Sequence, residues 1–135
     1  MKVLTIREPW ASLVGCGVKI IETRSWPTSY RGELYIHAGV HKISAKDERA
    51  MRLSKLIPNC QLHYGEIFIK CKLIDCVKID EDYAAKVRSE TPENFDCGNY
   101  TPGRYAWILT DIEYIEPILA KGRLSIWNYE KNEQC

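Results

Sequence analysis

Three charged side chains of different chemistry lie close together near the start of the chain. Lys19, Glu22 and Arg24 occur in a segment whose other residues favour a strand. A glutamate can accept a proton from water, and a lysine or arginine can bind a phosphate or stabilise a negative charge that develops in a reaction. The segment therefore predicts either a functional pocket or a solvated strand face, which is the usual place for charged residues.

Strand geometry predicts which of these side chains lie together. Successive side chains of a strand point to opposite faces, so Glu22 and Arg24 are expected on one face with Trp26. Thr23 is expected to face the other way. Lys19 falls in the turn that leads into the strand, and we expect the three charged groups to converge on a hollow that solvent can reach.

The composition excludes several classes of protein. The chain has 135 residues, of which 45% are apolar and 27% charged, with a formal net charge of +1. These values are typical of one globular domain, and the near-neutral charge means that any nucleic-acid binding has to depend on a local basic patch. No apolar run approaches the roughly 20 residues of a membrane helix, so we expect neither membrane association nor a signal peptide.

Six cysteines raise the question of disulfides or a metal site. No two of them have the gap of roughly two to four residues that zinc sites favour, and no secretory signal points to an oxidising compartment. We expect free thiols in a cytoplasmic protein, several of them packed as small hydrophobic residues, and neither a metal nor a cofactor. The cysteines are Cys16, Cys60, Cys71, Cys76, Cys97 and Cys135.

The hydrophobic pattern predicts short strands and a few short helices. Besides the strand with Glu22, strands are expected over residues 2–6, 33–39, 65–79, 105–109 and 122–129, with 112–118 as a weak strand or a connection. Helices are expected over residues 9–14, 45–56 and 80–89, the second capped by Ser44 and carrying a solvated face of alternating charge. Residues 90–103 predict a long loop of the kind that often carries function, and residues 130–135 a frayed tail.

The longest predicted strand indicates how the sheet is shaped. Apolar residues alternate through Ile67, Ile69, Cys71 and Leu73, and the alternation is lost at Ile74. Such a change of phase indicates a β-bulge or bend, and bends curl a sheet towards a barrel. The sequence therefore predicts an α+β fold, a small barrel of five or six strands with two or three short helices.

A further pattern runs through residues 9–13, 17–19, 22–26, 30–32, 34–36, 73–76, 105–109 and 121–127. Together these segments resemble the ASCH domain family. The resemblance implies a PUA-like β-barrel of mostly antiparallel strands, with residues 1–135 as a single domain. It also implies a cleft whose wall carries the Gly-x-Lys-x-x-Glu-x-Arg segment, and a ligand that is RNA or a nucleoside-like small molecule.

The first hypothesis is an RNA-binding or nucleotide-binding module. Lysine and arginine supply phosphate contacts, and aromatic rings stack on unpaired bases. The predicted ligand-binding residues are Trp10, Lys19, Glu22, Arg24, Tyr30, Arg31 and Tyr105, with Trp26 as a further stacking candidate. With a net charge of +1, such binding is expected to be modest and sensitive to salt.

The second hypothesis is a metal-independent hydrolase. The chain resembles N4-acetylcytidine amidohydrolases, which use a lysine, a threonine three residues later and a distant glutamate. Lys19 matches the lysine, but Glu22 occupies the threonine position, and Thr23 is one position away. Lys19 and Glu22 are then the predicted catalytic residues, Glu90 and Glu93 are the nearest candidates for the distant carboxylate, and cleavage of RNA by the same groups is a related alternative.

The third hypothesis is purely structural. In it, Glu22 and Arg24 form an ion pair that holds the strand against the first helix. A buried ion pair is commonly no more stabilising than an apolar replacement. A pair that is retained at a cleft therefore favours function without establishing it.

Overall fold

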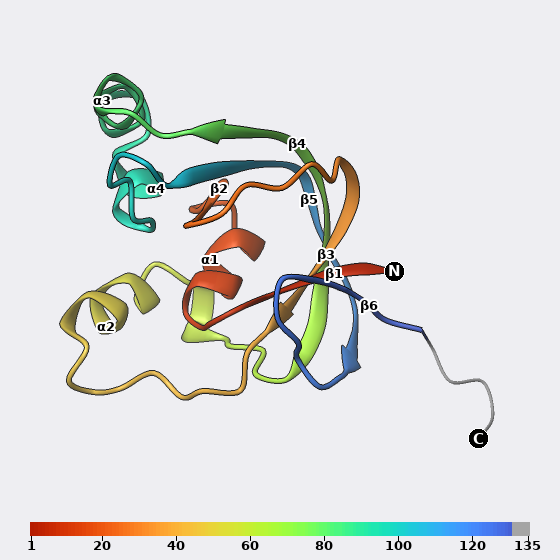
Figure 1. The fold of residues 1–135 in the computed structure, drawn as a ribbon. Helices are drawn as coiled ribbons and strands as arrows, with labels where there is room; N and C mark the ends of the chain where they lie inside the picture. The colour runs from red at the N-terminus through yellow and green to blue at the C-terminus, as the bar shows by residue number, and fades with distance from the viewer. Residues whose placement is uncertain (131–135) are drawn as a thin grey trace.

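The computed structural model describes residues 1–130, and a curled sheet of six strands forms the centre of this part of the chain (Figure 1). The strands lie in the order β2-β5-β4-β3-β1-β6, and all neighbours are antiparallel except β1 and β3. Their bounds are β1 Lys2–Ile6, β2 Ile21–Arg24, β3 Gly32–Ala38, β4 Glu66–Lys78, β5 Tyr105–Leu119 and β6 Ile126–Asn128. The prediction of an α+β fold with mostly antiparallel strands is confirmed, with the sheet curled into a half-barrel.

Four α-helices accompany the sheet in residues 1–130, where two or three were expected. They are α1 Trp10–Gly15, α2 Glu48–Ser54, α3 Glu81–Glu90 and α4 Pro92–Asp96, and a 3₁₀ turn spans Pro58–Cys60. The extra helix is α4, which lies inside the predicted loop 90–103. Proline is favoured in the first turn of a helix, so Pro92 begins α4 where the sequence pattern indicated only loop.

The helix predicted over residues 45–56 is shorter than expected. Asp47, not Ser44, caps α2, and its side chain accepts a hydrogen bond from the Ala50 N–H at 3.0 Å. An aspartate at this position satisfies one of the backbone donors that a helix start leaves without a partner. The helix therefore begins at Glu48.

The two longest strands bend the sheet. The pairing of β4 with β5 shifts register at three places, one of them between Leu73 and Asp75, where the lost alternation predicted a bulge. The strand predicted over residues 105–109 is longer than expected, because β5 continues to Leu119 and includes residues 112–118, which were predicted as a weak strand or a connection. Asp111 has a φ of 54°, which disturbs the alternation of side chains without ending the strand.

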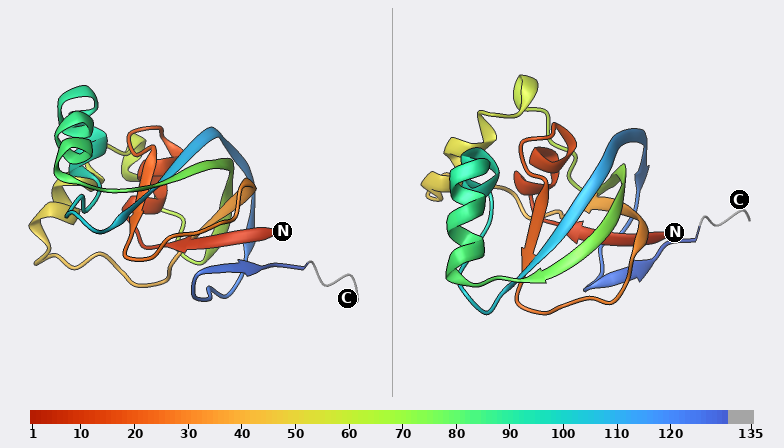
Figure 2. Two further views of the ribbon diagram at one scale, coloured as in Figure 1. Left: turned by 45° about the horizontal axis from the view of Figure 1, so that its top comes forward. Right: turned by 90° about the horizontal axis from the view of Figure 1, so that it is seen from above.

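Helix α1 packs into the curl of the sheet (Figure 2). Its buried residues Ala11 and Val14 join a cluster that includes Trp107 of β5 and Leu34 of β3. Burial of such side chains is the main source of stability in a domain of this size. The helix thus fixes the position of the turn that follows it, which carries Lys19.

Two buried groups support the sheet without taking part in the candidate site. His37 Nε2 lies 2.7 Å from the Ala120 carbonyl and Nδ1 lies 3.2 Å from Thr5 Oγ1, so this histidine joins three segments of the chain. Burial raises the pKa of the Cys71 thiol to about 12, which keeps it protonated and unreactive at neutral pH.

The cysteines of the described part of the chain are free, and Cys135 lies outside it. The predicted tail, apart from Glu130, also lies outside the described residues. Within residues 1–130, no helix has the length and apolar character needed to span a membrane.

Candidate functional site

A cavity of about 380 Å³ opens beside β2, and we call it the cleft. Helix α1 ends at Gly15, and Gly17, with a φ of +84°, turns the chain so that the Lys19 N–H donates to the Leu13 carbonyl. The chain then enters β2, which pairs with β5. The cleft is lined by Thr5, Ile6, Arg7, Trp10, Lys19, Glu22, Thr23, Arg24, Ser25, Trp26, Arg49, Cys97, Gly98, Asn99 and Arg104.

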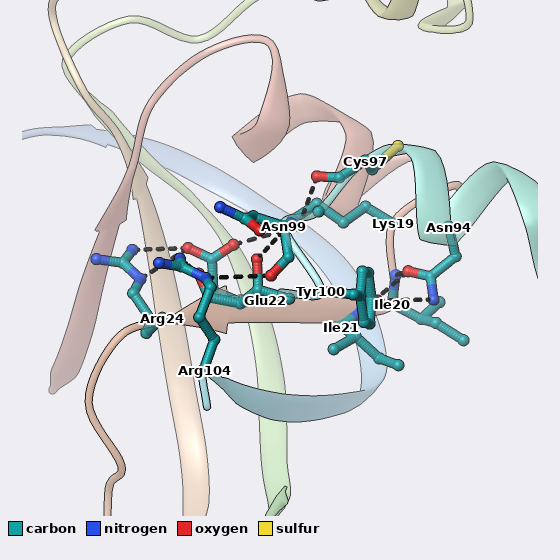
Figure 3. Close-up of polar contacts among 12 residues, drawn as sticks. Lys19, Ile20, Ile21, Glu22, Arg24, Asn94, Cys97, Asn99, Tyr100 and Arg104 are labelled. Atoms are coloured by element: carbon teal, nitrogen blue, oxygen red, sulfur yellow. Dashed lines mark hydrogen bonds and ion pairs between the residues drawn. The ribbon is translucent and has the colours of Figure 1, made fainter. Parts of the chain in front are cut away.

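Glu22, which lines the cleft, lies between the side chains of Lys19 and Arg24 (Figure 3). Its Oε1 is 3.3 Å from Lys19 Nζ, and its Oε2 accepts a hydrogen bond from Arg24 Nε at 2.8 Å and lies 2.7 Å from Arg24 Nη2 in an ion pair. The structure therefore brings together the three charged groups of the opening segment, and Glu22 and Arg24 share a face of β2 as strand geometry predicts.

The outer contacts of this cluster join it to the rest of the fold. The Lys19 side chain is only 1% exposed, and its ammonium donates to the Cys97 carbonyl at 3.0 Å. Arg24 Nη2 donates to the Thr5 carbonyl of β1 at 3.0 Å. Removing a charge from water is costly unless it is paired and hydrogen-bonded, so these contacts are needed for the cluster to be buried at all.

Thr23 also borders the cleft, although its side chain alternates with that of Glu22 along β2, which pairs with β5 in unbroken register. Its Oγ1 accepts a hydrogen bond from the Asn99 N–H at 3.0 Å, and it lines the same cavity as Glu22. The segment after α4 packs over Thr23 and also borders the cavity, since a Cβ added to Gly98 would lie 3.1 Å from Thr23 Cγ2. Thr23 therefore meets the cavity where the segment after α4 packs on it, a contact that alternation along β2 does not reveal.

Two arginines that line the cleft were not predicted by the sequence analysis. Arg49 of α2 was assigned to a solvated face, but its guanidinium donates to the Asp96 and Gly98 carbonyls. Arg104 donates from Nε to the Asn99 carbonyl at 3.1 Å and from Nη2 to the Thr23 carbonyl at 3.2 Å. The predicted loop 90–103, of a kind that often carries function, ends next to Arg104 and could have indicated that this residue belongs to the site. Nothing in the sequence near Arg49 indicated that it lines the cleft.

The start of β2 is positioned by a residue that the sequence analysis did not single out. Asn94 of α4 is 3% exposed, and its Oδ1 accepts hydrogen bonds from the Ile20 N–H at 2.9 Å and the Ile21 N–H at 3.3 Å. Burial raises the pKa of the neighbouring Tyr100 hydroxyl, which therefore stays protonated beside the Asn94 amide. Helix α4 thus holds the strand that carries Glu22.

Three predicted ligand-binding residues lie outside the lining of the cleft as residues 1–130 define it. The Tyr30 hydroxyl donates to the Glu33 carbonyl. The Arg31 guanidinium is 3.8 Å from the Asp75 carboxylate on an exposed surface. Tyr105 packs against the apolar cluster that includes Trp107.

The candidate distant carboxylates also lie elsewhere. Glu93 lines a separate hollow with Arg52 and Phe95, and Glu90 is an exposed residue at the end of α3. Glu22 is therefore the carboxylate of the cleft within residues 1–130.

Most of the charged side chains that line the cleft are basic, and two of the lining residues are tryptophans. Of the charged residues that line it within residues 1–130, five are basic (Arg7, Lys19, Arg24, Arg49 and Arg104) and one, Glu22, is acidic. Trp10 and Trp26 also line it, and the Arg24 guanidinium lies 5.6 Å from the centre of the Trp26 ring, within cation–π range. No cluster of three or more potential metal ligands was found among the described residues.

Comparison with known proteins identifies relatives of the chain. Human activating signal cointegrator 1 is 28% identical over 107 residues, which cover 71% of this chain and 18% of that protein. The mouse protein of the same name is 25% identical over 130 residues, which cover 94% of this chain and 22% of that protein. The chain thus spans about a fifth of the length of these relatives.

A solved structure and a family model agree with this relationship. The crystal structure of a mutant of ZmASCH from Zymomonas mobilis superposes with a TM-score of 0.53 and 16% identity, covering 87% of this chain and 74% of that one, which shows a shared fold. The family model of the ASCH domain matches residues 4–119, a range that includes most of the sheet, without β6, and the residues that line the cleft. The chain therefore belongs to the ASCH domain family.

Proposed function

We propose that the chain binds RNA or a nucleotide-like ligand in the cleft lined by Lys19, Glu22 and Arg24. The observation that carries the proposal is the excess of positive charge in the cleft. Among the lining residues that the structure describes, five are basic and one is acidic, in a chain whose net charge is +1. A local basic concentration of this kind attracts phosphates. The family resemblance, which implies RNA or nucleotide-like ligands, supports the same function.

The cleft offers separate contacts for a phosphate and for a base. Arg49 and Arg104 lie on its rim and can donate to phosphate oxygens in the directions that their backbone contacts leave open. Trp26 is 39% exposed and presents an aromatic surface on which a base can stack. A volume of about 380 Å³ falls within the range of small-molecule sites, so the cleft suits one base with its sugar and phosphate.

In this function the buried pair positions the binding groups. Glu22 accepts a hydrogen bond from Arg24 Nε and forms an ion pair with its Nη2, and these contacts fix the guanidinium beside Trp26. Lys19 forms an ion pair with the other carboxylate oxygen of Glu22. Its ammonium also donates a hydrogen bond to the Cys97 carbonyl, which connects the pair to the segment after α4. Burial raises the pKa of the Cys97 thiol, so this residue contributes its carbonyl and not a thiolate.

Replacement of Arg49 by glutamine tests the phosphate contacts. Each phosphate contact to a single strand makes the slope of log affinity against log salt more negative by about 0.7. The variant is therefore expected to reduce the magnitude of that slope by about 0.7. Fluorescence anisotropy with a short single-stranded RNA over a salt series measures it. Lys55→Gln, at the end of the same helix but outside the cleft, is the matched control and is expected to bind like the wild type. Equal slopes for the wild type and Arg49→Gln would contradict the assignment.

A second candidate function is hydrolysis of the acetyl amide of a modified nucleoside. The observation that favours it is that Lys19, Glu22 and Thr23 line one cavity, although strand geometry predicted that Thr23 would not. Water would add to the acetyl carbonyl carbon, and the C–N bond would break to give acetate and the free nucleoside. Glu22 would accept the proton of the water and pass it to the leaving nitrogen as the C–N bond breaks. The Thr23 hydroxyl, which accepts from the Asn99 N–H, would donate a hydrogen bond to the substrate.

Incubation with N4-acetylcytidine tests this second function. If the cleft is hydrolytic, cytidine is released by the wild type and by Thr23→Ser, which keeps the hydroxyl, and Thr23→Val is expected to release none. Chromatography of the products with time measures the turnover. Release by the wild type no faster than by Glu22→Gln would leave ligand binding as the function of the cleft.

A further inference from the structure

We propose that single-stranded RNA held in the cleft continues past Thr5 to a second contact site between β5 and β6. The inference rests on the proposed function, because the cleft supplies the first contacts. We call the second site the Lys121 patch. It is a hollow of about 390 Å³ lined by Ala120, Lys121, Arg123, Trp127, Asn128, Tyr129 and Glu130.

Thr5 of β1 connects the cleft to the Lys121 patch. It lines the cleft, and its carbonyl accepts the hydrogen bond from Arg24 Nη2. Its Oγ1 accepts a hydrogen bond of 3.0 Å from Nε1 of Trp127, a residue of the patch. One residue thus contacts a basic group of the cleft through its backbone and a wall of the patch through its side chain.

Gly122 brings the basic segment close to the sheet. A Cβ at this position would lie 3.0 Å from His37 Cε1 and 3.2 Å from Thr5 Cγ2, so a larger residue would push the segment outward. Strand β6, which follows the segment, pairs with β1, and the ribbons of the two strands run side by side (Figures 1 and 2). The neighbours of Gly122 are therefore held beside Thr5 at the edge of the cleft.

The charge of the Lys121 patch fits the phosphate backbone of a nucleic acid. Lys121 and Arg123 are exposed, and within residues 1–130 the lining of the patch contains two basic residues and one acidic residue, Glu130. Lys2, which lies outside the lining, pairs with Asn128 in the sheet. Trp127 is only 7% exposed and offers little surface for stacking, so the recognition expected here is electrostatic and independent of base sequence. A strand long enough to leave the cleft is the ligand that can use both sites.

The test compares RNAs of two lengths on Lys121→Ala/Arg123→Ala. Single-stranded oligonucleotides of about 4 and about 12 nucleotides cover the usual range of site sizes of single-strand-binding proteins. For the longer RNA, loss of two phosphate contacts is expected to reduce the magnitude of the slope of log affinity against log salt by about 1.4, because each contact contributes about 0.7. Binding of the shorter RNA is expected to be unchanged. The control Lys78→Ala/Lys86→Ala removes the same charge from exposed positions near α3 and is expected to match the wild type with both RNAs.

The outcomes separate this inference from the proposed function. If the double variant binds the longer RNA with wild-type affinity and slope while Arg49→Gln weakens both lengths, the patch is refuted and RNA binding by the cleft stands. An equal loss with both lengths would also refute the patch, since it would then not be a separate contact. If the wild type binds neither RNA, the proposed function fails and the patch fails with it.

Discussion

Replacement of Glu22 by glutamine is expected to lower the free energy of unfolding by about 3 to 5 kcal/mol, the usual cost of removing one partner of a buried ion pair. Glutamine keeps the shape of the side chain but removes the charge that lies 3.3 Å from Lys19 Nζ and 2.7 Å from Arg24 Nη2. The Lys19 side chain is 1% exposed. In the variant its ammonium would keep the hydrogen bond to the Cys97 carbonyl but lose the negative charge that balances it. Urea unfolding of the variant and the wild type measures the difference.

Two further variants establish that burial causes this loss. Glu33→Gln removes a glutamate of similar type whose pair with Lys70 is 3.3 Å long but about half exposed, and exposed pairs contribute only about 0 to 1 kcal/mol. Lys19→Met/Glu22→Gln removes the buried cation as well and is expected to lose less stability than the two single changes together. A loss for Glu22→Gln no larger than for Glu33→Gln would contradict the assignment of Glu22 as a buried counter-charge.

Replacement of Trp26 by alanine is expected to weaken RNA binding by about 1 to 3 kcal/mol, or roughly 5- to 150-fold, if a base stacks on this ring. Trp26 lines the cleft, is 39% exposed, and lies within cation–π distance of Arg24. Its carbonyl accepts from Trp107 Nε1, a backbone contact that alanine retains, so the fold is expected to persist. Anisotropy titration with a short single-stranded RNA measures the affinity.

The controls for Trp26 distinguish stacking from a general loss of aromatic surface. Trp26→Phe keeps a ring and is expected to recover most of the affinity. Tyr114→Ala removes an aromatic residue that is 58% exposed but lines a different hollow, and it is expected to bind like the wild type. Equal affinity of Trp26→Ala and the wild type, with unchanged stability, would show that the ligand does not use this wall.

The Glu22 and Trp26 results also bear on the structural hypothesis. A large loss of stability in Glu22→Gln is expected whether or not the cleft binds a ligand, because the pair is buried in either case. A loss of affinity in Trp26→Ala without a loss of stability is not expected from a cluster that only holds the fold together. The two measurements together therefore separate a binding site from a scaffold.

Local patterns in the sequence determined the elements of the sheet and the centre of the cleft. Alternating apolar residues predicted most strands, and the lost alternation at Ile74 predicted the bulge that the register of β4 and β5 shows. The spacing of Glu22 and Arg24 placed them on one face of β2, where the structure finds them paired. These predictions succeed because strand geometry depends on neighbouring residues alone.

Only the tertiary structure decided what surrounds that centre. Arg49 and Arg104 reach the cleft from distant segments, and Lys19 is held by a carbonyl 78 residues away, which no side-chain pattern can reveal. Tyr105 has a residue type suited to stacking, but it is partly buried against the apolar cluster and does not line the cleft. The physical reason is that the curl of the sheet and the packing of α2 and α4 determine which polar residues from distant segments lie together. Such long-range contacts cannot be read from local sequence patterns. The sequence by itself thus determined the charged segment of β2, and the fold decided which other groups form a site with it.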